Sequence, residues 1–298
     1  MTPSKPASKA ASLLRVLLAY VLAIGVGAAW LYLGPDTAYL WLDGLIADVL
    51  ATLVIFAFSR IHRNSSFYDA YWSVLPPLLA AYWWSESAPN DLRALLVTLV
   101  ITAWAVRLTA NWALLFPGLH HEDWRYPMLR EGRSGATEVA VDLVAIHLVP
   151  TLQVFLGMVP VYVAITVAGR DVGWLDWLAL LVGLGAVLLE LVADRQMQRF
   201  TRHRAPGAVM DRGLWGWSRH PNYLGEITFW FSLGLFGLAA APSDWWFVFV
   251  GAIAMLLLFL LASIPMMEKR SLERRPTYQD VIDRVPMLLP RPPRTARG

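Results

Sequence analysis

The chain has 298 residues, of which 57% are hydrophobic and 16% are charged, whereas a soluble domain carries about 25% charged residues. Its mean hydropathy of +0.49 and its long apolar runs between charged clusters indicate a polytopic helical membrane protein. The sequence contains no cysteine, which excludes disulfides and thiolate chemistry.

The predicted elements are membrane helices. Residues 1–12 are polar and basic and are expected to be disordered. Since a crossing needs roughly 20 apolar residues, we expect an all-α bundle of about eight spans over residues 13–265. The first span is too long for the apolar region of a signal peptide. The spans cover residues 13–33, 45–61, 67–84, 92–116, 139–168, 174–194, 222–241 and 245–265.

The fifth span is long enough to be tilted or broken at Pro150 or Pro160. After the last span, the charges and prolines of residues 266–298 predict a folded cap on the cytoplasmic face rather than a ninth span. This tail is cationic enough to bind anionic lipid headgroups.

The loops alternate in charge. Five segments, which include both termini, hold 22 of the 25 Lys and Arg residues, whereas the intervening loops contribute only Arg93 and Arg170. Because cytoplasmic loops are enriched in Lys and Arg, we expect both termini in the cytoplasm. Topology then explains the pI near 9.3, and no nucleic-acid partner is needed.

Ionisable groups inside the spans are candidate functional residues, because each costs about 2.5–3.5 kcal/mol at the centre of a membrane helix. Asp69 begins the third span and suits either a helix cap or a site. Arg107 and Asn111 share one helical face; either Arg107 snorkels or the pair faces into the bundle. His147 stands alone in an apolar helix, which favours a hydrogen-bonded core histidine.

The sixth span ends in a polar stripe. Glu190, Asp194 and Gln198 are four residues apart and therefore share one face. The two carboxylates repel each other unless a cation or a hydrogen-bond donor lies against them. One interpretation is an interfacial salt-bridge cluster with the arginines that follow. A face that lines a ligand is favoured, because the stripe runs toward the motif described next.

Residues 213–230, GLWGWSRHPNYLGEITFW, carry the strongest functional pattern. Pro221 has no N–H and suits the first position of a helix, which makes His220 the cap residue and places Tyr223 in the first turn. The free N–H groups of this turn, the helix dipole and Arg219 together predict an anion site, with phosphate or pyrophosphate as the ligand.

The same motif holds groups that an aromatic belt does not explain. An interfacial belt with a snorkelling arginine accounts for Trp215, Trp217 and Arg219. It does not account for Asn222 or for Glu226, which lies one turn deeper on the same face. These two side chains are suited to orienting a polar ring, and the indole rings offer faces for stacking.

Four segments resemble the DUF1295 family of bacterial membrane proteins. They are FYDAYWSVLP, HEDWRYPMLRE, GLWGWSRHPNYLGE and the tail EKR…RPTY…RVPMLLPRPP. The resemblance covers about residues 60–293, and its C-terminal half is similar to steroid 5α-reductases and more remotely to sterol C14/C7 reductases. The Asn-Tyr-x-Gly-Glu element is its most specific part. A bacterial inner-membrane location is implied.

The resemblance implies a reductase that uses NADPH to reduce an activated C=C bond in a lipophilic, steroid-, sterol- or isoprenoid-like substrate. By position it assigns cofactor binding to Arg107, Glu190, Asp194, Gln198, Trp215, Asn222, Tyr223, Glu226 and Glu268, and by a looser alignment it offers Arg199, Arg202 and Arg219 to the phosphates. His220, at the helix cap, and Arg270, just outside the last span, are further candidate cofactor residues. The chain lacks a counterpart of the N-terminal Gln-Glu pair and tyrosine that act on the steroid ketone in 5α-reductases. Val281 stands where relatives commonly carry a tyrosine. A steroid substrate therefore does not follow.

The implied chemistry is hydride transfer to the β-carbon of an enone-like substrate, with an acid that polarises the carbonyl. The candidate acids are Asp69, Glu122, Asp123 and Tyr126, provided that burial keeps one of them neutral. Glu122, Asp123 and Tyr126 lie in one loop, and the alternative interpretation of that loop is a charge-balanced cytoplasmic turn without a catalytic role. No metal is expected.

Two other functions stay open. Isoprenylcysteine carboxyl methyltransferases have a similar Arg-His-Pro-x-Tyr-x-Gly element and a charged tail, but bind S-adenosylmethionine. Asn222, Glu226, the paired tryptophans and the number of spans favour the reductase. A lipid- or nucleotide-binding protein without turnover is the second alternative, because no catalytic dyad is evident. A transporter is disfavoured, since the polar groups gather at one membrane face.

Overall fold

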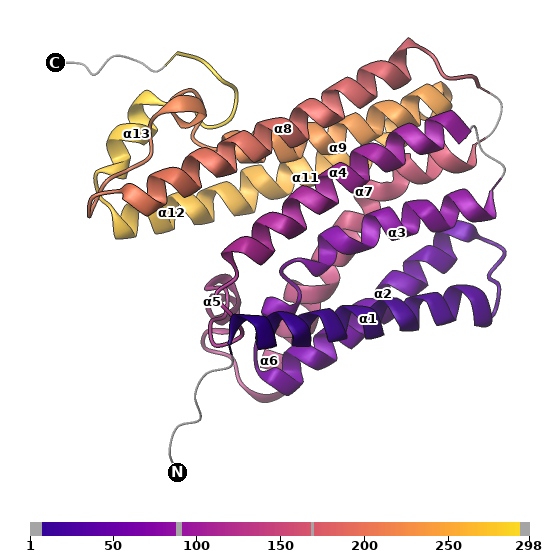
Figure 1. The fold of residues 1–298 in the computed structure, drawn as a ribbon, viewed down its shortest axis with the longest axis horizontal. Helices are drawn as coiled ribbons and strands as arrows, with labels where there is room; N and C mark the ends of the chain where they lie inside the picture. The colour runs from indigo at the N-terminus through magenta and orange to yellow at the C-terminus, as the bar shows by residue number, and fades with distance from the viewer. Residues whose placement is uncertain (1–7, 88–90, 168–169, 293–298) are drawn as a thin grey trace. The chain divides into compact units, whose positions relative to one another are not determined.

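The computed structural model describes residues 8–87, 91–167 and 170–292, which form helices and connecting loops without any strand (Figure 1). Helix α1 (Lys9–Leu33) begins within the segment predicted to be disordered, because the Ser8 hydroxyl accepts a hydrogen bond from the Ala11 N–H and caps it. Residues 1–7 of that predicted segment lie outside the described residues.

Seven helical runs in the described part of the chain are long and apolar enough to cross a membrane, which confirms the predicted all-α polytopic class. They are α1, α2 (Leu40–His62), α4 (Asp91–Leu115), Gly135–Thr166, α8 (Trp174–His203), α9 (Pro221–Ala240) and Pro242–Arg274. The predicted third span corresponds to α3 (Tyr71–Glu86), which has 16 residues and contains Pro76 and Pro77. It is shorter than the roughly 20 residues of a full crossing.

Two of these runs contain a π-helical turn. The run Gly135–Thr166 consists of α6 (Gly135–Val141), the π-helical η2 (Asp142–Leu148) and α7 (Val149–Thr166). The irregular turn thus comes just before Pro150, and the helix continues through Pro160. The last run consists of η4 (Pro242–Asp244), α10 (Trp245–Val248), α11 (Val250–Leu258), the π-helical η5 (Phe259–Ser263) and α12 (Ile264–Arg274). π-turns are frequent at functional sites.

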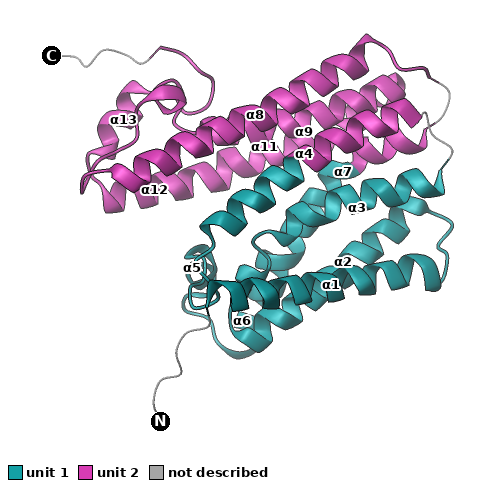
Figure 2. Cartoon of the chain, in the orientation of Figure 1, with its two compact units in different colours: residues 1–89, 104–158 teal, residues 90–103, 159–298 magenta. Residues whose placement is uncertain are grey.

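The chain divides into two compact units, coloured separately in Figure 2. Unit 1 consists of residues 1–89 and 104–158. Within it, α1 packs on α2 through small residues: Ala19, Ala23 and Ala51 are fully buried, and a Cβ on Gly27 would lie 3.3 Å from the carbonyl oxygen of Ala47. The loop after α2 contains η1 (Ser65–Phe67), and α5 (Arg125–Arg130) follows α4.

Unit 2 consists of residues 90–103 and 159–298 and contains α8 and α9, which pack side by side (Figure 1). At the start of α8, Asp176 forms a buried ion pair with Arg93, with 2.7 Å between the Arg93 Nε and an Asp176 oxygen. Past its far end lie η3 (Gly213–Gly216) and, after α12, the short α13 (Tyr278–Arg284). The candidate cofactor residues from 190 onward belong to this unit.

Candidate cofactor site

The start of α9 has the predicted form: Pro221 occupies the first helical turn and His220 is the cap residue. The preceding turn is fixed to α8 by two hydrogen bonds. The Trp215 indole N–H donates to the Ala193 carbonyl at 3.0 Å, and the Leu214 N–H donates to the Gln196 side chain at 2.9 Å. This anchoring orients the first turn of α9, with its free N–H groups, beside the end of α8.

Arg219 and His220 meet the same carboxylate. The Arg219 Nε lies 2.7 Å from Glu268 Oε1, and the His220 Nε2 lies 3.0 Å from that oxygen. A terminal nitrogen of Arg219 also donates to the carbonyls of Ile282 and Val285, at 2.9 and 2.6 Å. Much of the hydrogen-bonding capacity of Arg219 is therefore used to hold α12, α13 and the start of α9 together.

The C-terminal tail folds back over this turn. The Arg219 N–H donates to the Pro286 carbonyl at 2.9 Å, and the Arg291 N–H donates to the Trp217 carbonyl at 3.2 Å. The Ser218 hydroxyl donates to the Met287 carbonyl at 3.3 Å. These main-chain contacts give residues 278–292 a fixed path, in accord with a folded cap. The Trp217 side chain is half exposed.

A cavity of about 350 Å³ lies among the end of α8, the start of α9, α12 and α13. Five predicted cofactor residues line it: Trp215, Arg219, His220, Asn222 and Tyr223. The rings of His220 and Tyr223 are stacked, with centroids 5.2 Å apart. The acids and bases among its lining residues in the described part of the chain are Arg204, Arg219, His220, Arg275 and the phenols of Tyr223 and Tyr278. The cavity thus combines aromatic faces with positive charge.

Several lining residues were missed from the sequence. Met197 and Thr201 come from the last turns of α8 and Arg204 directly follows it; they continue the face of Glu190 and Asp194 toward the end of the helix. The tail adds Arg275, Tyr278 and Val281. Burial, with a contribution from the nearby Glu268 carboxylate, raises the pKa of Tyr278 to about 12, so its hydroxyl is a hydrogen-bond donor at neutral pH. Tyr278 lies one turn before Val281, the position at which the expected tyrosine is missing.

The predicted stripe on α8 does not line this cavity. Glu190 is buried, while Asp194 and Gln198 are partly buried. Glu190 packs against Gly225 of α9, where an added Cβ would lie 2.4 Å from the Glu190 Cγ. Glu226 is also buried and accepts a hydrogen bond of 2.9 Å from the Trp230 indole N–H. Both glutamates therefore lie deeper between the helices than the cavity.

The other predicted cofactor residues are distributed differently. Arg199 and Arg202 are exposed on α8, and Arg270 is partly buried on α12; none of the three lines the cavity. Arg107 is buried in the part of α4 that belongs to unit 1.

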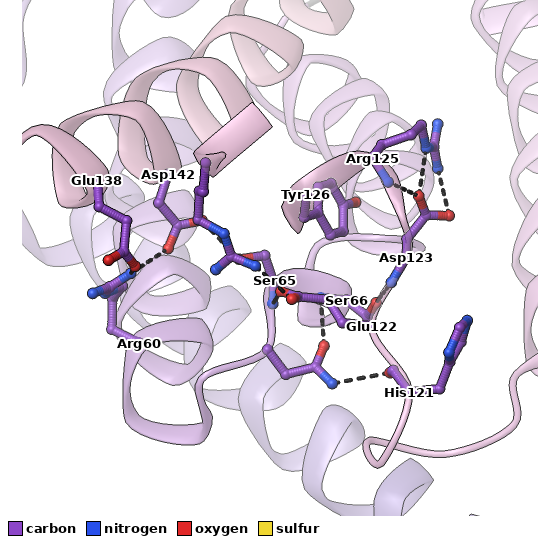
Figure 3. Close-up of polar contacts among 12 residues, drawn as sticks. Arg60, Ser65, Ser66, His121, Glu122, Asp123, Arg125, Tyr126, Glu138 and Asp142 are labelled. Carbon is purple, nitrogen blue, oxygen red and sulfur yellow. Dashed lines mark hydrogen bonds and ion pairs between the residues drawn. The ribbon is translucent and has the colours of Figure 1, made fainter. Parts of the chain in front are cut away.

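The predicted acids lie in unit 1, where the loop after α4 contacts the turn before α3 (Figure 3). Glu122 accepts a hydrogen bond of 2.7 Å from the Ser65 N–H and forms an ion pair with Arg130. Asp123 pairs with Arg125 at 2.8 Å. Burial raises the pKa of Asp123, but the hydrogen bonds and charge of Arg125 outweigh it and lower the pKa overall. These geometries hold Glu122 and Asp123 as paired carboxylates.

Asp69 and Tyr126 form a different kind of pair. The Tyr126 hydroxyl donates to Asp69 Oδ1 at 2.6 Å. Asp69 precedes α3 and lies outside the seven spans. Burial raises its pKa to about 6, although the Tyr126 hydrogen bond acts in the opposite direction. Burial and the Asp69 charge raise the pKa of Tyr126 well above its usual value. Asp69 and Tyr126 therefore retain a proton more readily than Asp123 does.

His147 is the core histidine that the sequence predicts. It is fully buried, its Nε2 lies 3.0 Å from the Ser59 hydroxyl, and its Nδ1 lies 2.8 Å from the Asp142 carbonyl. Asp142 in turn accepts hydrogen bonds from Ser65 at 2.6 Å and Arg60 at 3.1 Å. Both ring nitrogens are thus engaged in a network that joins η2 to α2.

Comparison with known proteins agrees with the resemblance found in the sequence. Residues 55–285, which include the cavity and the Asp69–Tyr126 pair, match the family described as "Protein of unknown function (DUF1295)". A protein of Schizosaccharomyces pombe, described as uncharacterized protein C594.04c, is 26% identical over 276 residues, covering 83% of this chain and 79% of the relative. No solved structure matches the chain significantly. Since the family match spans well over half of its length, the chain belongs to the DUF1295 family.

Proposed function

We propose that this protein is a membrane reductase that binds NADPH and reduces an activated C=C bond of a lipophilic substrate. The observation that carries the proposal is the cavity at the start of α9, which gathers five of the residues that the sequence predicts for the cofactor. Its volume of about 350 Å³ lies within the range of roughly 300–1,000 Å³ typical of ligand sites.

The charges of the cavity favour NADPH over S-adenosylmethionine. NADPH carries several negative charges on its phosphates, whereas S-adenosylmethionine carries a sulfonium cation. The described lining residues include three arginines and no carboxylate, and the nearby Glu268 is already paired with Arg219. A cluster of arginines attracts phosphate through charge-assisted hydrogen bonds and repels a cationic ligand.

The residues around the cavity divide into three roles. Arg204, Arg275 and the free N–H groups of the first turn of α9 bind phosphate oxygens. The side chains of Trp215 and Asn222 bind rings, the first by stacking and the second by amide hydrogen bonds. Glu268 keeps the turn before α9 in place by holding Arg219. NADPH, when bound, supplies the hydride.

The reduction also needs a proton. The Tyr126 hydroxyl is the proposed donor, and Asp69, which accepts its hydrogen bond at 2.6 Å, is proposed to orient it. A phenol or a protonated carboxylic acid in a buried position can polarise a carbonyl and stabilise the enolate. Glu122 and Asp123 serve instead to hold the loop, because each is paired with an arginine.

The test is ligand-dependent thermal stabilisation of the full-length protein in detergent. We expect NADPH at about 100 times its Kd to stabilise the fold by about 2.7 kcal/mol, and S-adenosylmethionine to have no effect. Replacement Asn222→Ala should reduce the NADPH shift, while Gln279→Ala, an exposed change on α13 outside the cavity, should keep it. Stabilisation by S-adenosylmethionine and not by NADPH would refute the reductase proposal and favour a methyltransferase. Stabilisation by neither would refute a dinucleotide site.

A further inference from the structure

A second cavity adjoins the one described above. It has a volume of about 200 Å³ and shares two of its lining residues, Arg204 and Arg275, with the first cavity. The other lining residues are Arg274 and the turn Pro206–Ala208, in which Gly207 has a φ of +79°. Three arginines at the C-terminal ends of α8 and α12 thus surround one small space in unit 2.

The positive charges of this cluster are not compensated by acids. No carboxylate in the described part of the chain forms an ion pair with Arg204, Arg274 or Arg275. Arg275 is partly buried and donates a hydrogen bond of 3.4 Å to the Ala208 carbonyl. Its burial, and then the charges of Arg204 and Arg274, lower its pKa. Arg204 and Arg274 are exposed, and their charges repel that of Arg275, a repulsion that an anion in the cavity would offset.

Elsewhere in unit 2 the arginines that face acids are paired with them. Arg219 binds Glu268, and Arg284 lies 3.1 Å from Asp211. Unlike these two, the three arginines of the cluster have no acid partner among the described residues, and they gather around one cavity. A guanidinium group binds phosphate in a bidentate manner, and a terminal phosphate monoester carries a charge of about −1.5 to −2 at pH 7. Such a group matches three arginines better than a singly charged diester does.

We propose that Arg204, Arg274 and Arg275 bind a phosphate monoester, namely the 2′-phosphate of NADPH, and thereby make the protein prefer NADPH to NADH. This inference rests on the proposed function. The shared residues Arg204 and Arg275 make the small cavity an extension of the larger one, so one ligand occupies both. The same chemistry is found in the headgroup of phosphatidic acid, which is the alternative source of a monoester at a membrane surface.

The experiment measures the dissociation constants of NADPH and NADH for the full-length protein in nanodiscs of phosphatidylcholine. The test variant is Arg274→Gln/Arg275→Gln. The control, Lys269→Gln/Arg195→Gln, removes two exposed charges from the same two helices without touching either cavity. We expect the test variant to bind NADPH about 10- to 100-fold more weakly, to weaken NADH binding far less, and so to lose its preference. The single variant Arg275→Lys, which retains Arg274, should keep part of the preference for NADPH.

Two further ligands separate this inference from the proposed function. Adenosine 2′,5′-bisphosphate should compete for the site in the wild type and not in the test variant, while adenosine, which carries no phosphate, should be unaffected by the change. If the wild type bound the bisphosphate in this manner but bound neither dinucleotide, the proposed reductase function would be refuted and the phosphate-monoester site would be supported. If NADPH bound and the test variant still preferred it to NADH, the phosphate-monoester site would be refuted while the reductase proposal would be unaffected.

Phosphatidic acid, added to the nanodiscs, tests the lipid alternative. If the arginine replacements weakened its binding while leaving the NADPH preference unchanged, the cluster would be a lipid site and the assignment to the 2′-phosphate would be wrong. A thermal melt of each variant without ligand identifies loss of folding, and Arg274→Gln alone, at an exposed position, provides a milder change that should still weaken NADPH selectively.

Discussion

Replacing Gly225 by alanine should separate α8 from α9 and destabilise unit 2. An added Cβ would lie 2.4 Å from the Glu190 Cγ and 3.0 Å from the Ala186 carbonyl oxygen. Glu190 is only 2% exposed, so its side chain has no room to turn away, and the carbonyl belongs to the backbone of α8. Overpacking of this kind costs about 1–3 kcal/mol, while the higher helix propensity of alanine returns at most about 1 kcal/mol.

Gly185 on α8 provides a matched control. A Cβ at this position would meet no heavy atom within 4 Å, so Gly185→Ala gains helix propensity without a clash. Because the gain in helix propensity is common to both, the two variants are expected to differ in stability by the overpacking cost of roughly 1–3 kcal/mol, with Gly225→Ala the less stable and Gly185→Ala at or above the wild type. The 15 tryptophans allow both melts to be followed by intrinsic fluorescence in detergent.

The Gly225→Ala variant should also bind NADPH more weakly, since the first turn of α9 carries Asn222 and Tyr223 into the cavity and moves with the helix. The reasoning fails if Gly225→Ala melts at or above the temperature of Gly185→Ala. It would also fail if the variant were destabilised while α8 and α9 kept their separation in a structure of the variant.

Three further outcomes are expected. Arg93→Ala or Asp176→Ala should cost about 3–5 kcal/mol, because each leaves a buried charge unpaired, whereas Arg93→Met/Asp176→Leu should recover much of this in chemical denaturation. The folded-state pKa of Asp69, about 6 against an unfolded 3.8, means that the native state binds the proton more tightly; stability should fall by about 2–3 kcal/mol as pH rises from about 4 to 6. In Asp69→Asn this part of the pH profile of the melting temperature should vanish. Glu268→Gln should release the tail to trypsin faster than Asp283→Asn, since Glu268 joins α12 to the start of α9 and Asp283 is exposed.

The helices could be predicted because the length of an apolar run determines whether it can cross a membrane. Likewise, Pro221 predicted the start of α9 because its ring and missing N–H restrict it to few helical positions. The prediction was less successful at α3, where the run of residues 67–84 looked continuous. Residues 65–67 form a short 3₁₀ turn instead, and the polar contacts of Ser65 and Asp69 with the loop after α4 keep this segment out of the helix.

The composition of the cavity could be predicted only in part. Local spacing placed Asn222 and Tyr223 beside the cap residue, and both line the cavity. Spacing also placed Glu190, Asp194 and Gln198 on one face, but it contains no information about which neighbour that face meets. Arg275 and Tyr278 come from a tail whose charges are explained equally well by membrane topology. Their role depends on the folding of α12 and α13 against α8, which is a tertiary contact between segments more than 70 residues apart.

The Asn-Tyr-x-Gly-Glu element therefore serves two physical purposes at once. Its first two residues, Asn222 and Tyr223, line the cavity. Its last two face the interior of unit 2: Gly225 allows α9 to approach Glu190, and Glu226 accepts a hydrogen bond from Trp230. A close helix contact one turn below the cavity holds the first turn of α9 rigidly against α8. Substitutions at Gly225 and Glu226 should thus affect ligand binding through the position of the helix, and only those at Asn222 and Tyr223 through direct contact.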